Sequence, residues 1–199
     1  MANHIVHLWG RISSISVRKV VWAAQELGLD FQRTDAGAGY GLTTTPEYQR
    51  KNPNGLVPLL EDGDFVLWES NAIVRYLWAR YGAELNFYPT ELEARFDAER
   101  WMDWQQTTFN RAGGQAFLQL VRTAPELRDA EVIRQSVAAT EPLLALLNTH
   151  LASRAYIGGE AFGMAEFIYQ APANSAGTEL AMLRKPDLTQ LDVACGNCP

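Results

Sequence analysis

The sequence predicts an α/β domain with the element order βαβ–ββα, followed by an all-helical domain. In the first part of the chain, short apolar runs of strand type alternate with helical periodicity. A turn-rich tetrapeptide then joins two further strand-like runs into a hairpin. Beyond about residue 90 no further strand pattern is evident. We therefore assign residues 1–82 to the first domain, residues 83–90 to a linker and residues 91–199 to the helical domain.

The composition indicates a globular protein with a substantial core. The chain has 199 residues, of which 47% are hydrophobic and 20% charged, enough for one large domain or two small ones. A net charge of -6 argues against nucleic-acid binding, which would need clustered Lys and Arg. The apolar runs are too short to span a membrane, and no signal-peptide pattern opens the sequence. We expect a cytoplasmic protein with no membrane or nucleic-acid partner.

The two cysteines, Cys195 and Cys198, lie in the last five residues, so no disulfide framework can staple the fold. Their spacing resembles a redox motif. An active pair, however, needs a helix N-terminus to lower the pKa of its first thiol, and here only Pro199 follows. We therefore expect no redox role for this pair.

The opening of the chain reads as a βαβ unit with parallel strands. Residues 5–9 form a short apolar run, and apolar residues between 17 and 27 then recur at helical spacing. Gly28 is a suitable helix stop, and residues 31–35 offer a second strand. Residues 36–51 are rich in Gly and Thr without periodicity, which predicts a long loop of the kind that often carries function.

A hairpin and two stretches of helix complete the expected elements. Residues 59–60 and 65–67 flank the turn at 61–64, and Ser70 is a good N-cap for a helix that runs to about Gly82. A long helical segment follows from 91 to about 121, with an interruption allowed at residues 113–114. A second runs from about 129 to 154, and Pro142 should kink it.

Two motifs give the sequence a family resemblance. Asn-Pro-Asn-Gly-Leu-Val-Pro at residues 52–58 and Leu-Trp-Glu-Ser-Asn-Ala-Ile at residues 67–73 resemble the paired signature of glutathione transferases. The resemblance covers roughly residues 4–166, and it is to the bacterial type with a serine at the catalytic position. It implies that the βαβ–ββα domain has a thioredoxin-like fold and binds glutathione, with the all-helical domain completing the architecture.

The resemblance also implies which residues bind glutathione. In this family the bond before Pro58 is cis, which exposes the Val57 main chain to pair with the cysteinyl part of glutathione like an added strand. Ser70 and the positive helix end suit the γ-glutamyl carboxylate, and Glu69 suits its ammonium. Asn54 or Lys51 could contact the glycyl end.

The resemblance points to Ser14 as the catalytic group. The family pattern Ser-x-x-x-Arg-x-Val matches residues 14–20, and such a serine donates a hydrogen bond to the glutathione thiolate. A thiol of pKa about 8.5 is only a few per cent ionised at pH 7, so a shift of about two units, about 2.7 kcal/mol, would make most of it thiolate. Ser13 is the alternative, and a further alternative is that Ser13, Ser14 and Ser16 are only capping and turn residues.

Two further groups of side chains bear on function. Trp104 and Phe109 could line a pocket for an electrophile, although core packing is the commoner use of such aromatic residues. His4, His7 and His150 lack metal-ligand spacing and are interpreted as surface residues of strands or helices. Glutathione is therefore the expected co-substrate, and no metal is implied.

The resemblance weakens near the end of the chain. The family usually has a Ser/Thr-x-x-Asp capping box where this sequence has Gly163 and Glu166, although Gly is a tolerable N-cap and Glu can still reach back. After about residue 167 the sequence is atypical, and residues 180–183 are the best remnant of the terminal helices. One hypothesis is a frame-shifted or substituted tail.

These observations predict an enzyme that conjugates the glutathione thiolate to a small hydrophobic electrophile. Two alternatives stay open: a related binding or interaction module without turnover, and a glutathione-dependent reductase of peroxides or disulfides that uses the same thiolate. Family members are commonly homodimers joined through the helix after Ser70 and the long helix of the second domain, so a homodimer is expected.

Overall fold

The computed structural model describes residues 5–85 and 87–168. His4, the Cys195–Cys198 pair and the predicted helical remnant at residues 180–183 lie outside the described residues. The atypical tail predicted after about residue 167 also lies almost wholly outside them.

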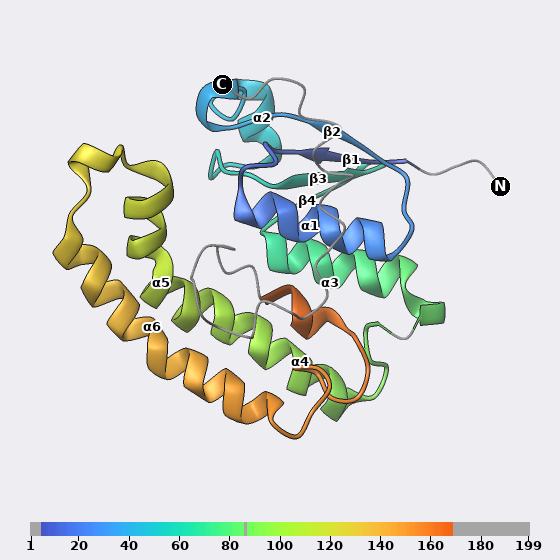
Figure 1. Ribbon diagram of the computed structural model, residues 1–199. Helices are drawn as coiled ribbons and strands as arrows, with labels where there is room; N and C mark the ends of the chain where they lie inside the picture. Colours follow the sequence, from blue (N-terminus) through green and yellow to red (C-terminus); the bar gives the residue numbers. More distant parts are fainter. Residues whose placement is uncertain (1–4, 86, 169–199) are drawn as a thin grey trace.

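The first half of the chain forms a four-stranded mixed sheet in the order β2-β1-β3-β4 (Figure 1). The strands are β1 (Val6–Trp9), β2 (Phe31–Thr34), β3 (Leu59–Asp62) and β4 (Phe65–Trp68). β1 pairs parallel with β2 and antiparallel with β3, and β3 pairs antiparallel with β4. The predicted βαβ unit and the predicted hairpin are therefore confirmed.

Helices cover both faces of this sheet. α1 (Ile15–Glu26) and α3 (Ser70–Tyr81) lie side by side on one face, and α2 (Pro46–Lys51) lies on the other (Figure 1). The alternation of β1 explains the two layers: Val6 and Leu8 are buried in the core shared with α1 and α3, whereas Trp9 packs with Tyr48 of α2. Gly28 ends α1 with a left-handed φ of 62°, as the sequence indicates.

The prediction of an unstructured loop at residues 36–51 is wrong. This stretch holds the short 3₁₀ helix η1 (Ala38–Tyr40) and α2. Thr45 caps α2 by accepting a hydrogen bond from the Tyr48 N–H, and Pro46 occupies the first helical position. Six residues are too few to show helical periodicity, so only the capping residues could have revealed this helix.

The second half is helical, as predicted. Its first long segment, residues 92–122, contains π-helical stretches and is not a regular α-helix throughout. It runs without a break through α4 (Leu92–Trp104), the π-helical η3 (Gln105–Phe109), α5 (Asn110–Phe117) and the π-helical η4 (Leu118–Arg122). No interruption occurs at Gly113 or Gly114, which lie inside α5. A Cβ on Gly113 would lie 3.5 Å from the Thr140 hydroxyl of the neighbouring helix, an ordinary van der Waals distance, so α5 could also carry an alanine there.

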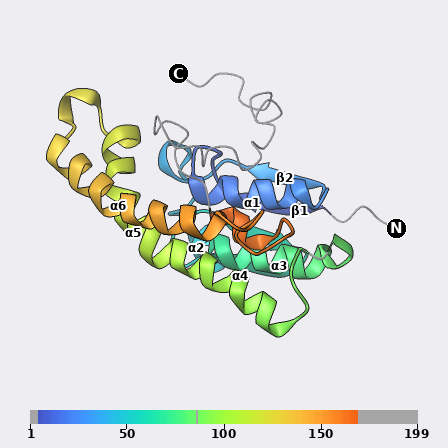
Figure 2. The same cartoon turned by 60° about the horizontal axis from the view of Figure 1, so that its bottom comes forward.

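That neighbour is α6 (Ala130–Leu151), which returns alongside α5 and α4 (Figure 2). Its N-cap Asp129 accepts hydrogen bonds from the N–H groups of Glu131 and Val132. Pro142, which was expected to kink the helix, lies inside it without ending it. Short 3₁₀ segments complete the described chain: η2 (Ala83–Leu85), η5 (Pro125–Leu127) and η6 (Met164–Ile168).

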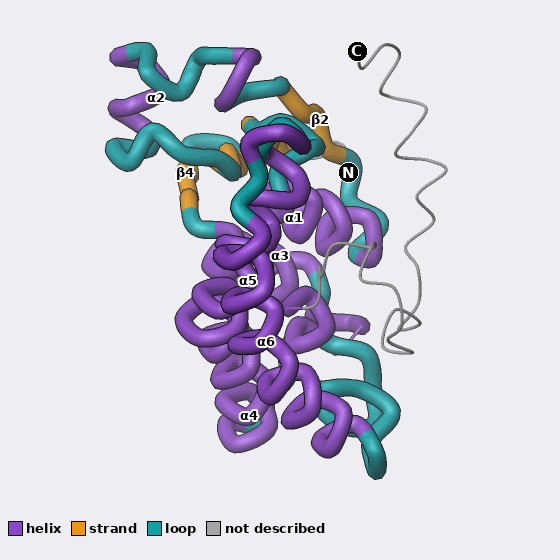
Figure 3. Tube along the Cα trace, turned by 60° about the vertical axis from the view of Figure 1, so that its left-hand side comes forward, coloured by secondary structure: helices purple, strands orange, loops and turns teal. Residues whose placement is uncertain are grey.

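One hydrophobic core joins the two halves. It extends from the inner face of the sheet through α1 and α3 to Trp101 and Met102 of α4, Leu147 of α6 and the turn before η6. Figure 3 shows the helical half against α1 and α3, on the side away from the sheet. Among the residues that the structure describes, no helix is both long and apolar enough to cross a membrane.

The buried carboxylate of Glu166 lies at the edge of this core, next to the core residues Met164 and Ala165. Glu166 is 3% exposed, and its oxygens accept from the N–H groups of Ile157 at 2.7 Å, Gly158 at 3.3 Å and Gly163 at 2.8 Å. The expectation that Glu166 reaches back to Gly163 is confirmed. Burial raises the pKa of Glu166, and the three N–H donors oppose that shift.

Replacing Glu166 with Ala should lower the free energy of unfolding by about 3 kcal/mol, because three N–H groups, including that of the buried Ile157, would lose their acceptor. Urea unfolding followed by tryptophan fluorescence measures this change. Glu160→Ala, at an exposed position two residues from Gly158, is the control and should stay within about 0.5 kcal/mol of wild type. Equal urea midpoints for the two variants would contradict the role assigned to Glu166.

Candidate functional site

The register of the sheet brings three separate segments to one edge. Trp9 at the end of β1 lies opposite Leu59 at the start of β3, and Leu59 lies opposite Trp68 at the end of β4. The loop that leaves β1, the Val57–Pro58 dipeptide that enters β3 and the turn that leaves β4 must therefore adjoin. The first and the last of these lead into the N-termini of α1 and α3.

Ser14 lies at the N-cap position of α1 with extended backbone angles, and its side chain makes no capping hydrogen bond. The hydroxyl is half-buried and is not used by its own helix. Ser13 is exposed, and its carbonyl accepts a hydrogen bond from the Arg122 guanidinium at 2.8 Å. Position and side-chain freedom thus favour Ser14 over Ser13, and the catalytic assignment stays a prediction.

The Val57–Pro58 bond is cis. The preceding carbonyl, that of Leu56, accepts hydrogen bonds from the Tyr48 hydroxyl at 2.7 Å and the Asn52 amide at 2.9 Å. Within the described chain, the Val57 N–H and C=O take part in no main-chain hydrogen bond of the turns and loops. This leaves the Val57 main chain available to an extended ligand.

Two residues that support this loop were missed in the sequence. Asn52 is 2% exposed, and its oxygen also accepts from the Asn54 N–H at 3.1 Å. Burial raises the pKa of Tyr48 to about 12, so the phenol stays a donor at neutral pH. Asn52 could have been identified from its place at the start of the Asn-Pro-Asn-Gly motif. No sequence pattern points to Tyr48.

The structure corrects the predicted cap of α3. Glu69, not Ser70, is the N-cap residue, and it has a positive φ of 74°. A positive φ is uncommon outside glycine, and such strained residues cluster at ligand sites. Ser70 is instead the first helical residue and is only 4% exposed. The two residues remain adjacent at the helix mouth, as the sequence indicates.

Of the two candidates for the glycyl end, Lys51 has other partners. Its ammonium lies 2.5 Å from the Glu61 carboxylate and 5.3 Å from the centre of the Trp9 ring. The indole N–H of Trp9 also donates to the Glu61 carboxylate at 2.8 Å, so Lys51, Glu61 and Trp9 hold one another in place where α2 ends. Asn54, three residues before Val57, is exposed, and its amide donates only a long hydrogen bond of 3.4 Å to the Asn52 oxygen, so it is the better candidate.

The aromatic pair predicted for an electrophile pocket lies in the long helical segment. Trp104 and Phe109 are half-buried, with ring centres 5.6 Å apart, and both pack against the core. Trp101, 8% exposed, is a core residue that meets Trp104 edge-on at 5.4 Å. Core packing of the pair is therefore observed, and a role in a pocket remains a prediction.

Three arginines surround the serine turn without an ion pair in the described part of the chain. The Nε atoms of Arg11 and Arg18 are buried without a hydrogen-bond partner, and Arg122 contacts the Ser13 carbonyl. Burial, and then repulsion from Arg122, lowers the pKa of Arg18. Together with the positive end of α1, these charges favour an anion near Ser14.

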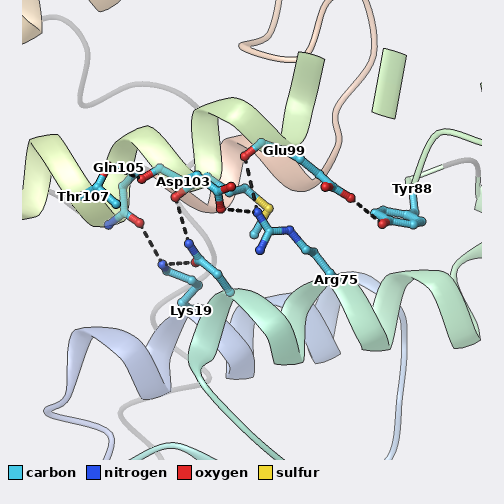
Figure 4. Close-up of polar contacts among 9 residues, drawn as sticks. Lys19, Arg75, Tyr88, Glu99, Asp103, Gln105 and Thr107 are labelled. Atoms are coloured by element: carbon cyan, nitrogen blue, oxygen red, sulfur yellow. Dashed lines mark hydrogen bonds and ion pairs between the residues drawn. The ribbon is translucent and has the colours of Figure 1, made fainter. Parts of the chain in front are cut away.

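A buried lysine connects both helices of the site to the helical half (Figure 4). The Lys19 ammonium, in α1, donates to the Asn71 side-chain oxygen at 2.6 Å and to the Gln105 side-chain oxygen at 3.0 Å. The Asn71 amide donates to the Met102 carbonyl at 2.9 Å. Burial, and then the charge of Arg75, lowers the pKa of Lys19 to about 8. Sequence reasoning missed this group.

Of the three histidines, His7 and His150 lie in the described residues, on a strand and a helix as expected, and each is half-buried with a polar partner. His7 is half-buried and contacts the Thr34 hydroxyl at 2.8 Å and the Glu61 carboxylate at 3.3 Å. His150 is half-buried and contacts the Ile157 carbonyl at 2.9 Å. In the described ranges no group of three or more His, Cys, Asp and Glu side chains could hold a metal ion.

These features define a class of protein. A sheet in the order β2-β1-β3-β4 with a cis-proline before β3, two helix N-termini at one edge and an all-helical second half is the architecture of glutathione transferases, with a thioredoxin-like N-terminal domain.

Comparisons with known proteins agree with this class. Residues 5–79 match the family model described as glutathione S-transferase, N-terminal domain. Glutathione S-transferase GstB of Escherichia coli (strain K12) is 41% identical over 172 residues, 83% of this chain and 82% of the relative. Glutathione S-transferase 3 of Zea mays is 32% identical over 165 residues, 80% of this chain and 72% of the relative.

A solved structure is similar as well. The theta class glutathione S-transferase from Xanthomonas axonopodis pv. citri with glutathione bound superimposes with a TM-score of 0.79 and 40% identity, over 82% of this chain and 78% of that one. The chain belongs to the glutathione S-transferase family.

The buried Lys19 should make stability depend on alkaline pH. Below about pH 8 Lys19 is protonated in both the folded and the unfolded protein, and the folded protein bears the full cost of a buried charge. Between about pH 8 and 10.5 Lys19 loses its proton in the folded protein only, so this cost decreases as the pH rises. The free energy of unfolding should therefore rise with pH across this window, relative to Lys19→Met, by roughly 2–3 kcal/mol in total. Urea unfolding of both proteins from pH 7 to 10.5 measures the difference, and a flat difference would contradict a lowered pKa.

Proposed function

We propose that this chain is a glutathione transferase in which Ser14 stabilises the glutathione thiolate for attack on a small hydrophobic electrophile. The observation that carries the proposal is the sheet edge where the loop that leads to Ser14 meets the Val57–Pro58 dipeptide and the turn at Glu69–Ser70, together with a Ser14 hydroxyl that does not cap its own helix. Family membership supports it, as does the glutathione bound to the similar Xanthomonas axonopodis pv. citri enzyme.

Glutathione would bind mostly through groups that the fold fixes in advance. The Val57 main chain pairs with the cysteinyl part like an added strand. Ser70 and the N–H groups of the first turn of α3 receive the γ-glutamyl carboxylate, and Glu69 receives the ammonium. The Asn54 side chain is within the same loop and takes the glycyl end. No metal takes part in this scheme.

The chemistry starts from ionisation of the bound thiol. The thiol loses its proton to solvent, and the thiolate then accepts a hydrogen bond from the Ser14 hydroxyl. The positive end of α1 and the charges of Arg11 and Arg18, which have no ion pair among the described residues, lower the pKa of the thiol further. The thiolate attacks the electrophilic carbon, a carbon–sulfur bond forms, and the leaving group departs with its electron pair. Proximity of the two reactants supplies the rest of the acceleration.

The remaining parts of the proposal concern the second domain and the assembly. We place the glutathione site in residues 1–82 and the electrophile pocket in residues 91–199, with Trp104 and Phe109 as wall residues. We also propose that the protein works in the cytoplasm as a homodimer formed through α3 and the long helical segment.

Ser14→Ala should lower kcat/KM for a chlorodinitrobenzene roughly 100-fold at pH 6.5, because the thiolate loses its hydrogen-bond donor. The defect should shrink toward pH 9, where the thiol ionises unaided, a trend that a pH series of the conjugation rate measures. Ser13→Ala, one residue away, should retain near-normal turnover. The reverse pattern between the two variants would assign the catalytic hydroxyl to Ser13.

Ser70→Ala should weaken glutathione binding by about tenfold, since a hydrogen bond to a charged carboxylate contributes roughly 1.5–3 kcal/mol. Calorimetric titration measures the dissociation constant, with Ser16→Ala on the first turn of α1 as the control. Wild-type protein that binds glutathione but conjugates no electrophile would instead favour the non-catalytic binding module. Wild-type protein that is folded and binds no glutathione would overturn the proposal.

A further inference from the structure

We propose that Lys19 is a positioning residue that couples both helices of the glutathione site to the helical half of the protein, so that glutathione affinity depends on Gln105, a residue outside the glutathione-binding domain. The inference rests on the proposed function, because it concerns the same site. Lys19 is not assigned any contact with glutathione.

The position of Lys19 makes it a common anchor for the two helix N-termini. It lies in α1, five residues after Ser14, about 7 Å along the helix axis. Its side chain is 2% exposed and binds Asn71, the residue directly after Ser70. One ammonium therefore fixes the helix that carries Ser14 against the helix that carries Ser70.

The second partner of Lys19 comes from the helical half. Gln105 is 4% exposed and is the first residue of the π-helical η3. A π-helical turn inside an α-helix frequently marks a functional site. Here it occurs where the helix presents Gln105 to the buried ammonium of α1 (Figure 4).

The hydrogen bonds leave each amide only one orientation. The Asn71 nitrogen donates to the Met102 carbonyl at 2.9 Å, so the Asn71 oxygen must face Lys19. The Gln105 nitrogen donates to the Asn110 side-chain oxygen at 2.7 Å, so the Gln105 oxygen must also face Lys19. A shift of α4 and η3 would therefore break hydrogen bonds to both α1 and α3.

The charges around Lys19 argue that it is present for placement more than for stability. Arg75 of α3 repels it, although Arg75 is itself paired with Asp103 at 2.5 Å, and Glu69 attracts it. Two of its acceptors, those of Asn71 and Gln105, are neutral amides, which stabilise a buried ammonium less than a carboxylate would. An apolar side chain would avoid the desolvation penalty. What Lys19 provides and an apolar residue cannot is a fixed register among three helices.

An independent contact supports the same coupling at the other end of the long helical segment. Arg122, the last residue of the second π-helical stretch, donates to the Ser13 carbonyl at 2.8 Å. The helical half thus contacts α1 at its serine turn and again at Lys19. Both contacts come from π-helical segments, where the widened turn changes which side chains face α1.

A double-mutant cycle on glutathione binding tests the proposal in the full-length protein. Lys19→Met and Gln105→Leu should each weaken glutathione binding roughly five- to tenfold, and the double variant should bind no more weakly than Lys19→Met alone. In steady-state assays the KM for glutathione should rise by a similar factor while kcat at saturating glutathione changes less than twofold. Leu147→Ala, which truncates a buried side chain of α6, is the control for a general loss of stability and should bind normally.

The outcomes separate this inference from the proposed function. A folded wild-type protein that binds no glutathione overturns both. Normal affinity in both Lys19→Met and Gln105→Leu, with a wild type that binds, overturns the inference alone, because the residues then serve stability only. Fully additive losses overturn it as well, since they show no shared network. If Lys19→Met does not fold, Gln105→Leu decides by itself: weakened binding supports the coupling, and normal binding overturns it.

Discussion

The packing of the two halves depends on the hydrogen bonds that the buried ammonium of Lys19 donates. Three helices meet around this group, and each contributes a polar atom that has no access to water. Apolar contacts alone tolerate small sliding movements between helices, because dispersion and area burial have no direction. Hydrogen bonds of 2.6–3.0 Å do not, so this network converts a general hydrophobic interface into one with a defined register. The aromatic and aliphatic core around it supplies most of the stabilisation.

The sheet supplies the second constraint. Because β1 and β4 run in the same direction while β3 opposes both, the loops after Trp9 and Trp68 and the dipeptide before Leu59 must meet at one edge. Segments that are about 50 residues apart in sequence thus form one site without any loop of unusual length. The supporting hydrogen bonds of Asn52 and Tyr48 then hold the Val57 loop in place. Binding groups taken from the main chain and helix ends are fixed by the fold itself.

The sequence predicted those features of the fold that short local patterns determine, such as the order of the strands and helices. Short apolar runs, the Gly28 stop and the hairpin turn predicted the βαβ–ββα order, and the Val57–Pro58 and Glu69–Ser70 motifs indicated the candidate site. It did not predict α2, whose six residues show capping chemistry but no period. It placed the α3 cap one residue late, because a positive φ at Glu69 has no sequence signature outside glycine. The burial of Lys19 could not be predicted either, since a lysine on an amphipathic helix is ordinarily exposed.

The charge distribution shows why net charge alone does not decide what the site attracts. The chain has a net charge of -6, yet glutathione is itself anionic. Charges more than about 8–10 Å away are largely screened at physiological ionic strength, so the groups near the site dominate. There Arg11, Arg18 and Arg122 have no ion-pair partner among the described residues, and the N-termini of α1 and α3 add positive partial charge. An acidic protein can therefore keep a locally positive site, provided that its carboxylates pair with cations elsewhere, as Glu61 does with Lys51 and Asp103 with Arg75.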